Sequence, residues 1–140
     1  MKKKIAVYTS TRADFGLLKP VIEKLKSSKN IETRIFVTGT HLDPKFGETV
    51  SEIEKDFKDL IYYRVPQNMS EDPKLKNLRV MSEAFLKYAE ALTEDLPDFA
   101  LVLGDRYEAF CFGSVCASLA ISIAHLHGGE LTLGAIDDKF

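Results

Sequence analysis

The chain has 140 residues, of which 45% are hydrophobic and 29% are charged, and its formal net charge is −2. This length and composition suit one globular domain with a sizeable core, and the near-neutral mixture of charges argues against a broad nucleic-acid interface. Because the apolar run at residues 5–8 is too short for a signal peptide and no stretch approaches transmembrane length, we expect a cytoplasmic protein that binds neither nucleic acid nor membrane.

Short apolar runs alternate with longer amphipathic segments along the whole chain. Residues 5–9 form the first β-rich run, and apolar side chains between Leu17 and Leu25 then recur at helical spacing. The same alternation continues to the last strand, so the predicted order is βαβαβαβαβ. The later predicted strands are residues 33–38, 61–65, 99–103 and 121–125, and the later predicted helices are residues 50–57, 75–96 and 107–120.

Strands separated by helices pair in parallel, because each connection crosses a face of the sheet before the chain returns in the same direction. The sequence therefore predicts a doubly wound, Rossmann-like α/β domain spanning residues 1–140, with strand order 3-2-1-4-5. The long irregular segment at residues 65–76 is a candidate flexible loop over a site. No closing helical pattern precedes Phe140, so we expect a second domain beyond it.

Polar and charged side chains gather at one edge of the predicted sheet. In an open parallel sheet the ligand lies beyond the carboxyl ends of the strands, where the strand order reverses and the loops diverge. The first strand lies beside the fourth in the predicted order, so the turns that follow them share one crevice. The side chains that follow the strands at this edge are Arg12, Asp14, His41, Asp105, Arg106, Glu108, His125, His127 and Glu130.

Two of these turns suit a bound phosphate. Residues 9–16 and 104–108 each open a helix, whose free backbone N–H groups and positive end favour an anion. Arg12 and Arg106 would add guanidinium donors to the two turns. No glycine-rich dinucleotide or P-loop motif follows the first strand, so the sequence disfavours those two chemistries.

The same residues also permit purely structural roles. Thr11 with Asp14, and Asp105 with Glu108, have the spacing of capping boxes, which satisfy the first amides of a helix. His41, which follows the second strand, either contacts a ligand or caps the second helix. These interpretations do not exclude a ligand, because a capping residue also lies at a helix end.

A histidine pair near the last strand raises the question of a metal. His125 and His127 are two residues apart, so they share a face if both lie on the strand, and Glu130 or Asp137 would have to complete the site. Histidines in such a pair, without a third ligand at a recognisable spacing, are more often hydrogen-bonded residues of the interior or of a site. We therefore expect no metal and no cofactor.

Five short segments contain most of these polar residues. They are residues 9–16 (TSTRADFG), 38–41 (TGTH), 104–108 (GDRYE), 125–130 (HLHGGE) and 134–138 (GAIDD). In this order they resemble the successive signatures of the hydrolysing UDP-N-acetylglucosamine 2-epimerases of sialic-acid and related nonulosonate pathways. The resemblance covers all 140 residues and implies an enzyme of two Rossmann-like domains in the GT-B arrangement, of which this chain is the N-terminal one and is inactive alone.

The resemblance also implies a reaction and its binding partners. The family eliminates UDP from the sugar nucleotide to give a glycal and then adds water, which releases the free 2-epimeric amino sugar. The implied substrate is a UDP-amino sugar, either UDP-N-acetylglucosamine or a UDP-diacetamido sugar, and the implied full-length protein is a homodimer or homotetramer. The resemblance and their place at the crevice predict substrate and UDP binding for Arg12, Ala13, Asp14, His41, Arg106 and Glu108.

The implied chemistry needs a base for the C2 proton and a pair of groups that steer water. By resemblance, Asp105 is a catalytic carboxylate, and Asp137 and Asp138 form an acidic pair downstream. Some relatives carry glutamate where this chain has His127. The base is therefore either His127 or Glu130.

Two alternatives come from other classes of protein. A GT-B glycosyltransferase shares the fold and the UDP-sugar donor, but it transfers the sugar to an acceptor. A flavodoxin-like or receiver-like binding module is not an enzyme, and we expect such a module to close with an amphipathic helix, which this sequence lacks.

Overall fold

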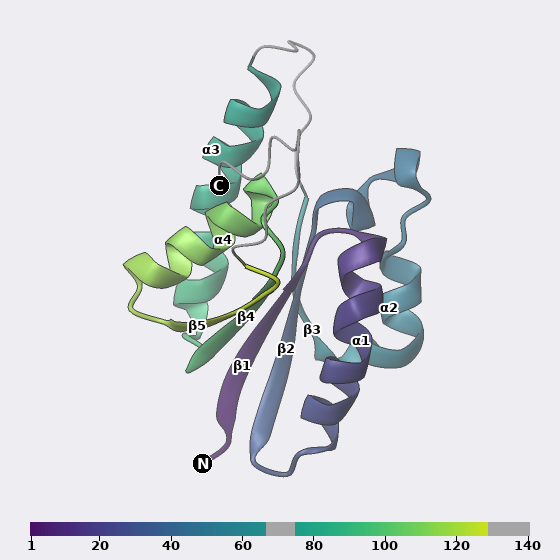
Figure 1. The fold of residues 1–140 in the computed structure, drawn as a ribbon, viewed down its shortest axis with the longest axis vertical. Helices are drawn as coiled ribbons and strands as arrows, with labels where there is room; N and C mark the ends of the chain where they lie inside the picture. Colours follow the sequence, from purple (N-terminus) through teal and green to yellow (C-terminus); the bar gives the residue numbers. More distant parts are fainter. Residues whose placement is uncertain (67–74, 129–140) are drawn as a thin grey trace.

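The computed structural model describes residues 1–66 and 75–128. Their strands form one parallel sheet in the order β3-β2-β1-β4-β5, so the predicted strand order is confirmed (Figure 1). Neighbouring strands pair in parallel throughout, from Lys3 opposite Ile31 to Leu103 opposite Leu126. The strands are β1 (Lys3–Thr9), β2 (Ile31–Thr38), β3 (Ile61–Val65), β4 (Phe99–Leu103) and β5 (Ser122–Leu126).

Within the described residues, four α-helices cover the two faces of the sheet (Figure 1). Because successive side chains of a strand point to opposite faces, β1 sends Ala6 and Tyr8 into one core and Val7 into the other. Two helices pack on the Val7 side, and two pack on the Tyr8 side. The first pair is α1 (Arg12–Ser27) and α2 (Val50–Phe57), the second is α3 (Lys76–Glu94) and α4 (Tyr107–Ser118), and the short 3-10 helices are η1 (Gly39–Leu42), η2 (Pro44–Phe46) and η3 (Lys58–Leu60).

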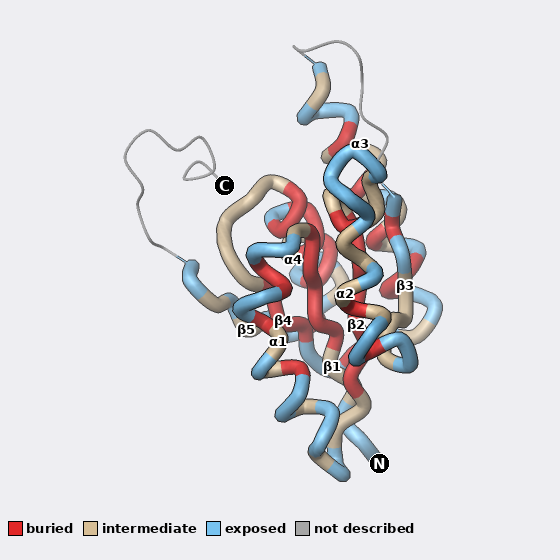
Figure 2. The backbone as a smooth tube through the Cα atoms, turned by 90° about the vertical axis from the view of Figure 1, so that its right-hand side faces the viewer, coloured by how far each residue is buried: buried red, intermediate tan, exposed pale blue. Residues whose placement is uncertain are grey.

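The core on the α3–α4 side is built around three aromatic rings. Figure 2 shows that the middle strands lie inside the fold, whereas the outer faces of the helices are exposed. The ring of Tyr8 stacks on Phe112 at a centroid distance of 4.8 Å and meets Tyr88 edge-on at 5.8 Å. The Tyr88 hydroxyl lies 3.3 Å from that of Tyr8 and 3.1 Å from that of Thr38. Burial and the neighbouring Tyr88 hold the pKa of Tyr8 well above its ordinary value, so this phenol stays protonated.

Several elements end at other residues than predicted, and the reasons are local. β1 and β2 begin earlier than predicted, because Lys3 pairs with Ile31 through the backbone although its side chain is charged. α4 ends at Ser118, and Ala120 just beyond it adopts the left-handed conformation with a φ of 56°. Residues 67–74, in the predicted loop over the site, lie outside the described residues.

Helix α4 is rich in apolar side chains but short. Its two cysteines, Cys111 and Cys116, are buried, and burial raises the pKa of both thiols to about 12. They are therefore inert core thiols at neutral pH, as their protonated form is a poor nucleophile.

None of the helices in the two described stretches combines the length and the hydropathy that crossing a bilayer requires.

Candidate functional site at the carboxyl edge of the sheet

The turn between β1 and α1 is built around the carboxylate of Asp14. This carboxylate accepts hydrogen bonds from the backbone N–H groups of Ser10 and Thr11, each at 3.0 Å, and from the Thr9 hydroxyl at 2.6 Å. The Thr11 hydroxyl accepts from the backbone N–H of Asp14 at 3.2 Å, so the capping box predicted here is confirmed. Asp14 is buried, and the protein itself engages its carboxylate.

These contacts keep Asp14 ionised and leave two other amides open. Burial by itself would raise the pKa of Asp14, but the nearby His41 and the hydrogen bonds from the surrounding turn outweigh it and lower the pKa below its ordinary value. Among the described residues, no hydrogen bond engages the backbone N–H groups of Arg12 and Ala13, the first two of α1. An anion at this turn would therefore meet those two amides, and substrate contact by Asp14 stays a prediction.

His41, in η1, is buried between the turns that follow β1 and β2. Its Nε2 lies 2.9 Å from the Thr9 hydroxyl, and its Nδ1 lies 2.8 Å from the Thr49 hydroxyl. Thr9 gives its only hydroxyl proton to Asp14, so its oxygen accepts a hydrogen bond from Nε2–H of His41. The imidazole thus ties the turn after β1 to the start of α2.

This arrangement corrects one prediction and adds two residues. The capping role for His41 is wrong, because the residue that precedes α2 is Thr49 and no side chain caps the helix there. Contact between His41 and a ligand stays a prediction, and its side chain is 0% exposed in this domain. Sequence reasoning missed the hydroxyls of Thr9 and Thr49, because they meet His41 only after separate segments have folded together.

The turn after β2 packs closely on the turn after β1. Gly39 has a φ of 59°, and a Cβ atom at this position would lie 2.7 Å from the carbonyl oxygen of Ser10. Glycine avoids both the strained backbone and the clash. The same carbonyl accepts a hydrogen bond from the Thr40 hydroxyl at 3.1 Å, so a hydrogen bond as well as close packing joins the two turns.

The turns after β4 and β5 are joined in a similar way. Gly104 has a φ of 82°, and its N–H donates to the carbonyl of Leu126 at 2.9 Å. The Nε2 of His125 lies 2.5 Å from the Gly104 carbonyl and donates to it. Asp105 follows and is half-buried, and in the part of the chain that the structure describes no hydrogen bond or ion pair engages its carboxylate. The structure therefore places the Asp105 carboxylate at the carboxyl edge of the sheet, where it has no structural task among those residues.

Glu108 is buried in the first turn of α4 and pairs with Arg106. Its two carboxylate oxygens accept hydrogen bonds from Nε of Arg106 at 3.3 Å and from a terminal nitrogen of Arg106 at 3.1 Å. The capping box predicted for Asp105 and Glu108 is wrong, because Arg106 takes the N-cap position and no side chain caps the helix. The helix starts one residue too late for that spacing.

The end of β5 also differs from the prediction. β5 ends at Leu126, and His127 adopts the left-handed conformation with a φ of 53°. Side chains alternate between the two faces only along an extended strand, so His127 does not share a strand face with His125. Among residues 1–66 and 75–128, no group of three or more metal-ligating side chains is close enough to hold an ion. Glu130, Asp137 and Asp138 lie outside the described residues.

Arg12 lies on the α1 side of this edge and is paired with α2. Its Nε lies 2.9 Å from a carboxylate oxygen of Glu52, and its side chain is 73% exposed. The pair lines a surface groove of about 410 Å³, together with a second pair formed by Lys19 and Asp56. No contact joins Arg12 to Arg106 within the described stretches, so a shared role of the two arginines depends on a ligand that reaches both.

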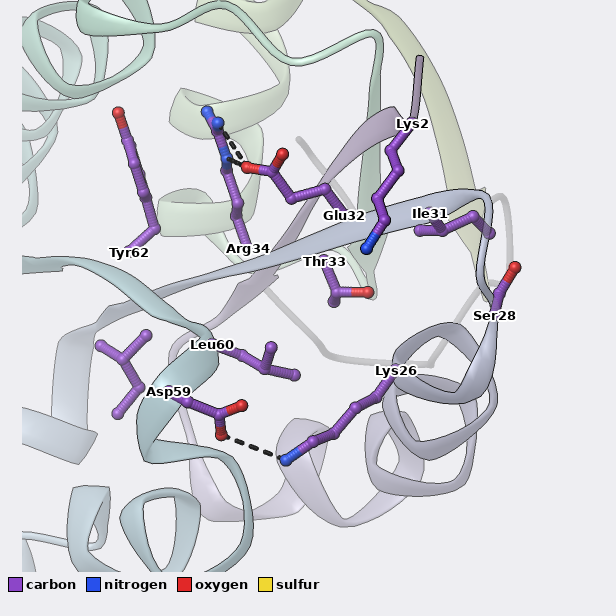
Figure 3. A pocket seen from close by; sticks show the side chains of 11 residues that line it. Lys2, Lys26, Ser28, Ile31, Glu32, Thr33, Arg34, Asp59, Leu60 and Tyr62 are labelled. Carbon is purple, nitrogen blue, oxygen red and sulfur yellow. Dashed lines mark hydrogen bonds and ion pairs between the residues drawn. The ribbon is translucent and has the colours of Figure 1, made fainter.

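Another cavity, of about 390 Å³, lies at the opposite edge of the sheet (Figure 3). It forms because β3 begins opposite Ile35, which leaves residues 31–34 of β2 without a neighbouring strand on that side. Lys26 points toward Asp59 in Figure 3 and pairs with it, and Arg34 pairs with Glu32. These charges are compensated inside the protein, so we retain the carboxyl edge as the candidate site.

The sequence matches a family model described as UDP-N-acetylglucosamine 2-epimerase over residues 23–140. The GDP/UDP-N,N'-diacetylbacillosamine 2-epimerase (hydrolyzing) of Campylobacter jejuni is 42% identical over 138 residues, which are 99% of this chain and 35% of that protein. The UDP-N-acetylglucosamine 2-epimerase of Neisseria meningitidis is 30% identical over 138 residues, which are 98% of this chain and 35% of that protein. The chain thus spans about a third of the length of these relatives.

Two solved structures with a similar fold come from proteins described as UDP-N-acetylglucosamine 2-epimerases. A crystal structure of a UDP-N-acetylglucosamine 2-epimerase has a TM-score of 0.79 at 21% identity, and the match covers 100% of this chain and 37% of that one. The Neisseria meningitidis enzyme bound to UDP-GlcNAc has a TM-score of 0.74 at 21% identity, with 94% of this chain and 34% of that one covered. At this identity the likeness establishes the doubly wound, Rossmann-like fold.

Proposed function

This chain belongs to the UDP-N-acetylglucosamine 2-epimerase family, and from that membership we propose that the full-length protein is a hydrolysing 2-epimerase of a UDP-activated N-acetylamino sugar. The proposed reaction eliminates UDP to give a glycal, and addition of water then releases the free 2-epimeric amino sugar. This chain is then the N-terminal domain of a GT-B pair, with the sugar nucleotide between the domains. Its coverage of about a third of the hydrolysing relatives supports this arrangement.

The observation that carries the proposal is the pair of helix starts at the carboxyl ends of β1 and β4. These strands are neighbours in the sheet, and each leads directly into a helix, α1 or α4. The first turn offers the open amides of Arg12 and Ala13, and the second offers the guanidinium of Arg106. Such donors stabilise the charge that develops on a departing diphosphate.

We assign proton transfer to side chains at the same edge. The C2 proton of the sugar is only weakly acidic, so the elimination needs a positioned base. We propose Asp105 as a catalytic carboxylate and either His127 or Glu130 as the base. The proposed pair that steers water onto the glycal is Asp137 and Asp138.

The relatives suggest which substrate to test first. Identity to the GDP/UDP-N,N'-diacetylbacillosamine 2-epimerase is 42%, compared with 30% to the Neisseria meningitidis UDP-N-acetylglucosamine 2-epimerase. This difference favours a UDP-diacetamido sugar over UDP-N-acetylglucosamine. We propose that the product enters the synthesis of sialic acid or a related nonulosonate, and that the enzyme is a cytoplasmic homodimer or homotetramer that binds neither membrane nor nucleic acid.

Product analysis with both sugar nucleotides tests the proposed function. We expect the full-length protein, incubated without any acceptor in deuterated water, to release UDP and a free 2-epimeric amino sugar that carries deuterium at C2. The label follows from the mechanism, because elimination removes the C2 proton and hydration restores one from solvent. Release of sugar with its original C2 configuration and no deuterium would instead favour the glycosyltransferase.

Replacing Arg12 by alanine should weaken UDP binding by about 10-fold, because a charge-assisted contact to phosphate is lost. The present partner of Arg12, Glu52, does not prevent this role, since exposed ion pairs are worth only about 0 to 1 kcal/mol. Calorimetry with UDP measures the effect. Lys19→Ala is the matched control, because Lys19 is also an exposed cation of α1 that pairs with α2. Equal affinities for wild type and Arg12→Ala would assign Arg12 to the Glu52 pair alone.

A further inference from the structure

The buried carboxylate of Glu108 has a single described cationic partner. The Glu108 side chain is 3% exposed, whereas that of Arg106 is 43% exposed. A carboxylate removed from water to this degree requires a compensating positive charge and hydrogen bonds. Arg106 provides both, and its guanidinium therefore lies between the buried carboxylate and the solvent at the carboxyl edge.

The geometry of this pair restricts the guanidinium. Two nitrogens of Arg106 donate to two different oxygens of Glu108, and such a paired contact fixes the plane of the guanidinium as well as its position. Glu108 is itself held by its place in the first turn of α4. It also lies close enough to Tyr8 to contribute to the raised pKa of that phenol, after burial and Tyr88. The carboxylate is thus fixed where α4 meets β1, inside the protein.

We infer that Glu108 is a positioning residue that holds the guanidinium of Arg106 toward the diphosphate of the sugar nucleotide and does not touch the nucleotide itself. This revises the expectation that Glu108 contacts substrate, because a side chain so fully withdrawn has little surface to offer a ligand. The inference rests on the proposed function, since it concerns how Arg106 receives UDP. It predicts that the two side chains contribute to UDP affinity as one unit.

A double-mutant cycle on UDP affinity tests this coupling. In the full-length protein, Glu108→Gln keeps the size of the side chain and removes its charge. We expect UDP to bind about 10-fold more weakly, because the guanidinium loses its fixed orientation. In an Arg106→Ala background the same change should alter affinity by less than about 2-fold, because nothing remains to be positioned. Calorimetry with UDP supplies all four affinities.

The matched control is Glu54→Gln. Glu54 accepts a hydrogen bond from Arg64, so this change also removes a carboxylate from an arginine, but on the surface of α2. We expect no change in UDP affinity for it. Circular dichroism checks that each variant folds, and Arg106→Gln or Glu108→Asp replaces a variant that does not.

Two outcomes would overturn the inference. One is an unchanged affinity in Glu108→Gln, and the other is the same loss with and without Arg106, which would mean that Glu108 acts on the nucleotide by another route. Wild-type protein that fails to bind UDP would contradict the proposed function and the inference together. Wild-type protein that binds UDP and epimerises, with no coupling between the two residues, would contradict the inference alone.

Discussion

The Asp105→Asn variant of the full-length protein should turn over its UDP-sugar on the order of 100-fold more slowly, or worse, with nearly unchanged affinity for UDP. Asparagine has almost the same shape as aspartate but neither accepts nor delivers a proton at neutral pH. The structure supports a catalytic role, because Asp105 follows Gly104 at the carboxyl edge and its carboxylate has no partner among the described residues. Steady-state kinetics and calorimetry with UDP separate the two effects.

A matched control lies at the other end of the same strand. Asp98 immediately precedes β4, where its carboxylate pairs with Lys3 at 2.7 Å, so Asp98→Asn removes a carboxylate from the amino edge. We expect its kcat to stay within about 2-fold of wild type, since exposed pairs contribute little. Unchanged turnover in Asp105→Asn would remove Asp105 from the mechanism. A loss of UDP affinity as large as the loss of kcat would make Asp105 a binding residue.

The fold could be predicted from the sequence because the hydropathy patterns that indicate each strand and helix are local. Each strand is a short apolar run between helical segments, and parallel crossovers then allow few strand orders. The predicted strands 61–65 and 99–103 coincide with β3 and β4, and the second of them is an apolar run bounded by Asp98 and Gly104. The earlier starts of β1 and β2 were not predictable from hydropathy, because the backbone pairing there includes the charged residues Lys3, Lys4 and Glu32.

The site was predictable only in part, because its contacts connect distant segments. The box formed by Thr11 and Asp14 has a local spacing that the structure retains. The capping box predicted for Asp105 and Glu108 has the same spacing, but it requires Asp105 at the N-cap. The N-cap of α4 is Arg106, one residue later, and Glu108 accepts hydrogen bonds from the side chain of Arg106 instead. No local pattern shows where a helix begins to within one residue, and that single residue changed the role of a carboxylate.

The buried network around Asp14 gives a second large expected effect. Asp14→Asn should lower the free energy of unfolding by about 2 to 3 kcal/mol at neutral pH, since hydrogen bonds to a charged group contribute this much. In addition, the side-chain NH2 group of asparagine is a hydrogen-bond donor, and it would face groups that are themselves donors. In the structure those donors are the N–H groups of Ser10 and Thr11 and the hydroxyl of Thr9. Urea unfolding followed by circular dichroism measures the difference.

The pH dependence of this difference identifies its cause. The pKa of Asp14 is lowered in the folded state, so its contribution is fully present above the ordinary carboxyl pKa of about 4 and is lost as the pH falls through the folded value below it. Wild type and Asp14→Asn should therefore approach equal stability toward pH 2. Asp56→Asn serves as the control, because the pKa of Asp56 is also lowered, by Lys19, but on the exposed surface. A difference between wild type and Asp14→Asn that persists unchanged at low pH would show that shape, and not charge, makes Asp14 important to the turn that carries Arg12.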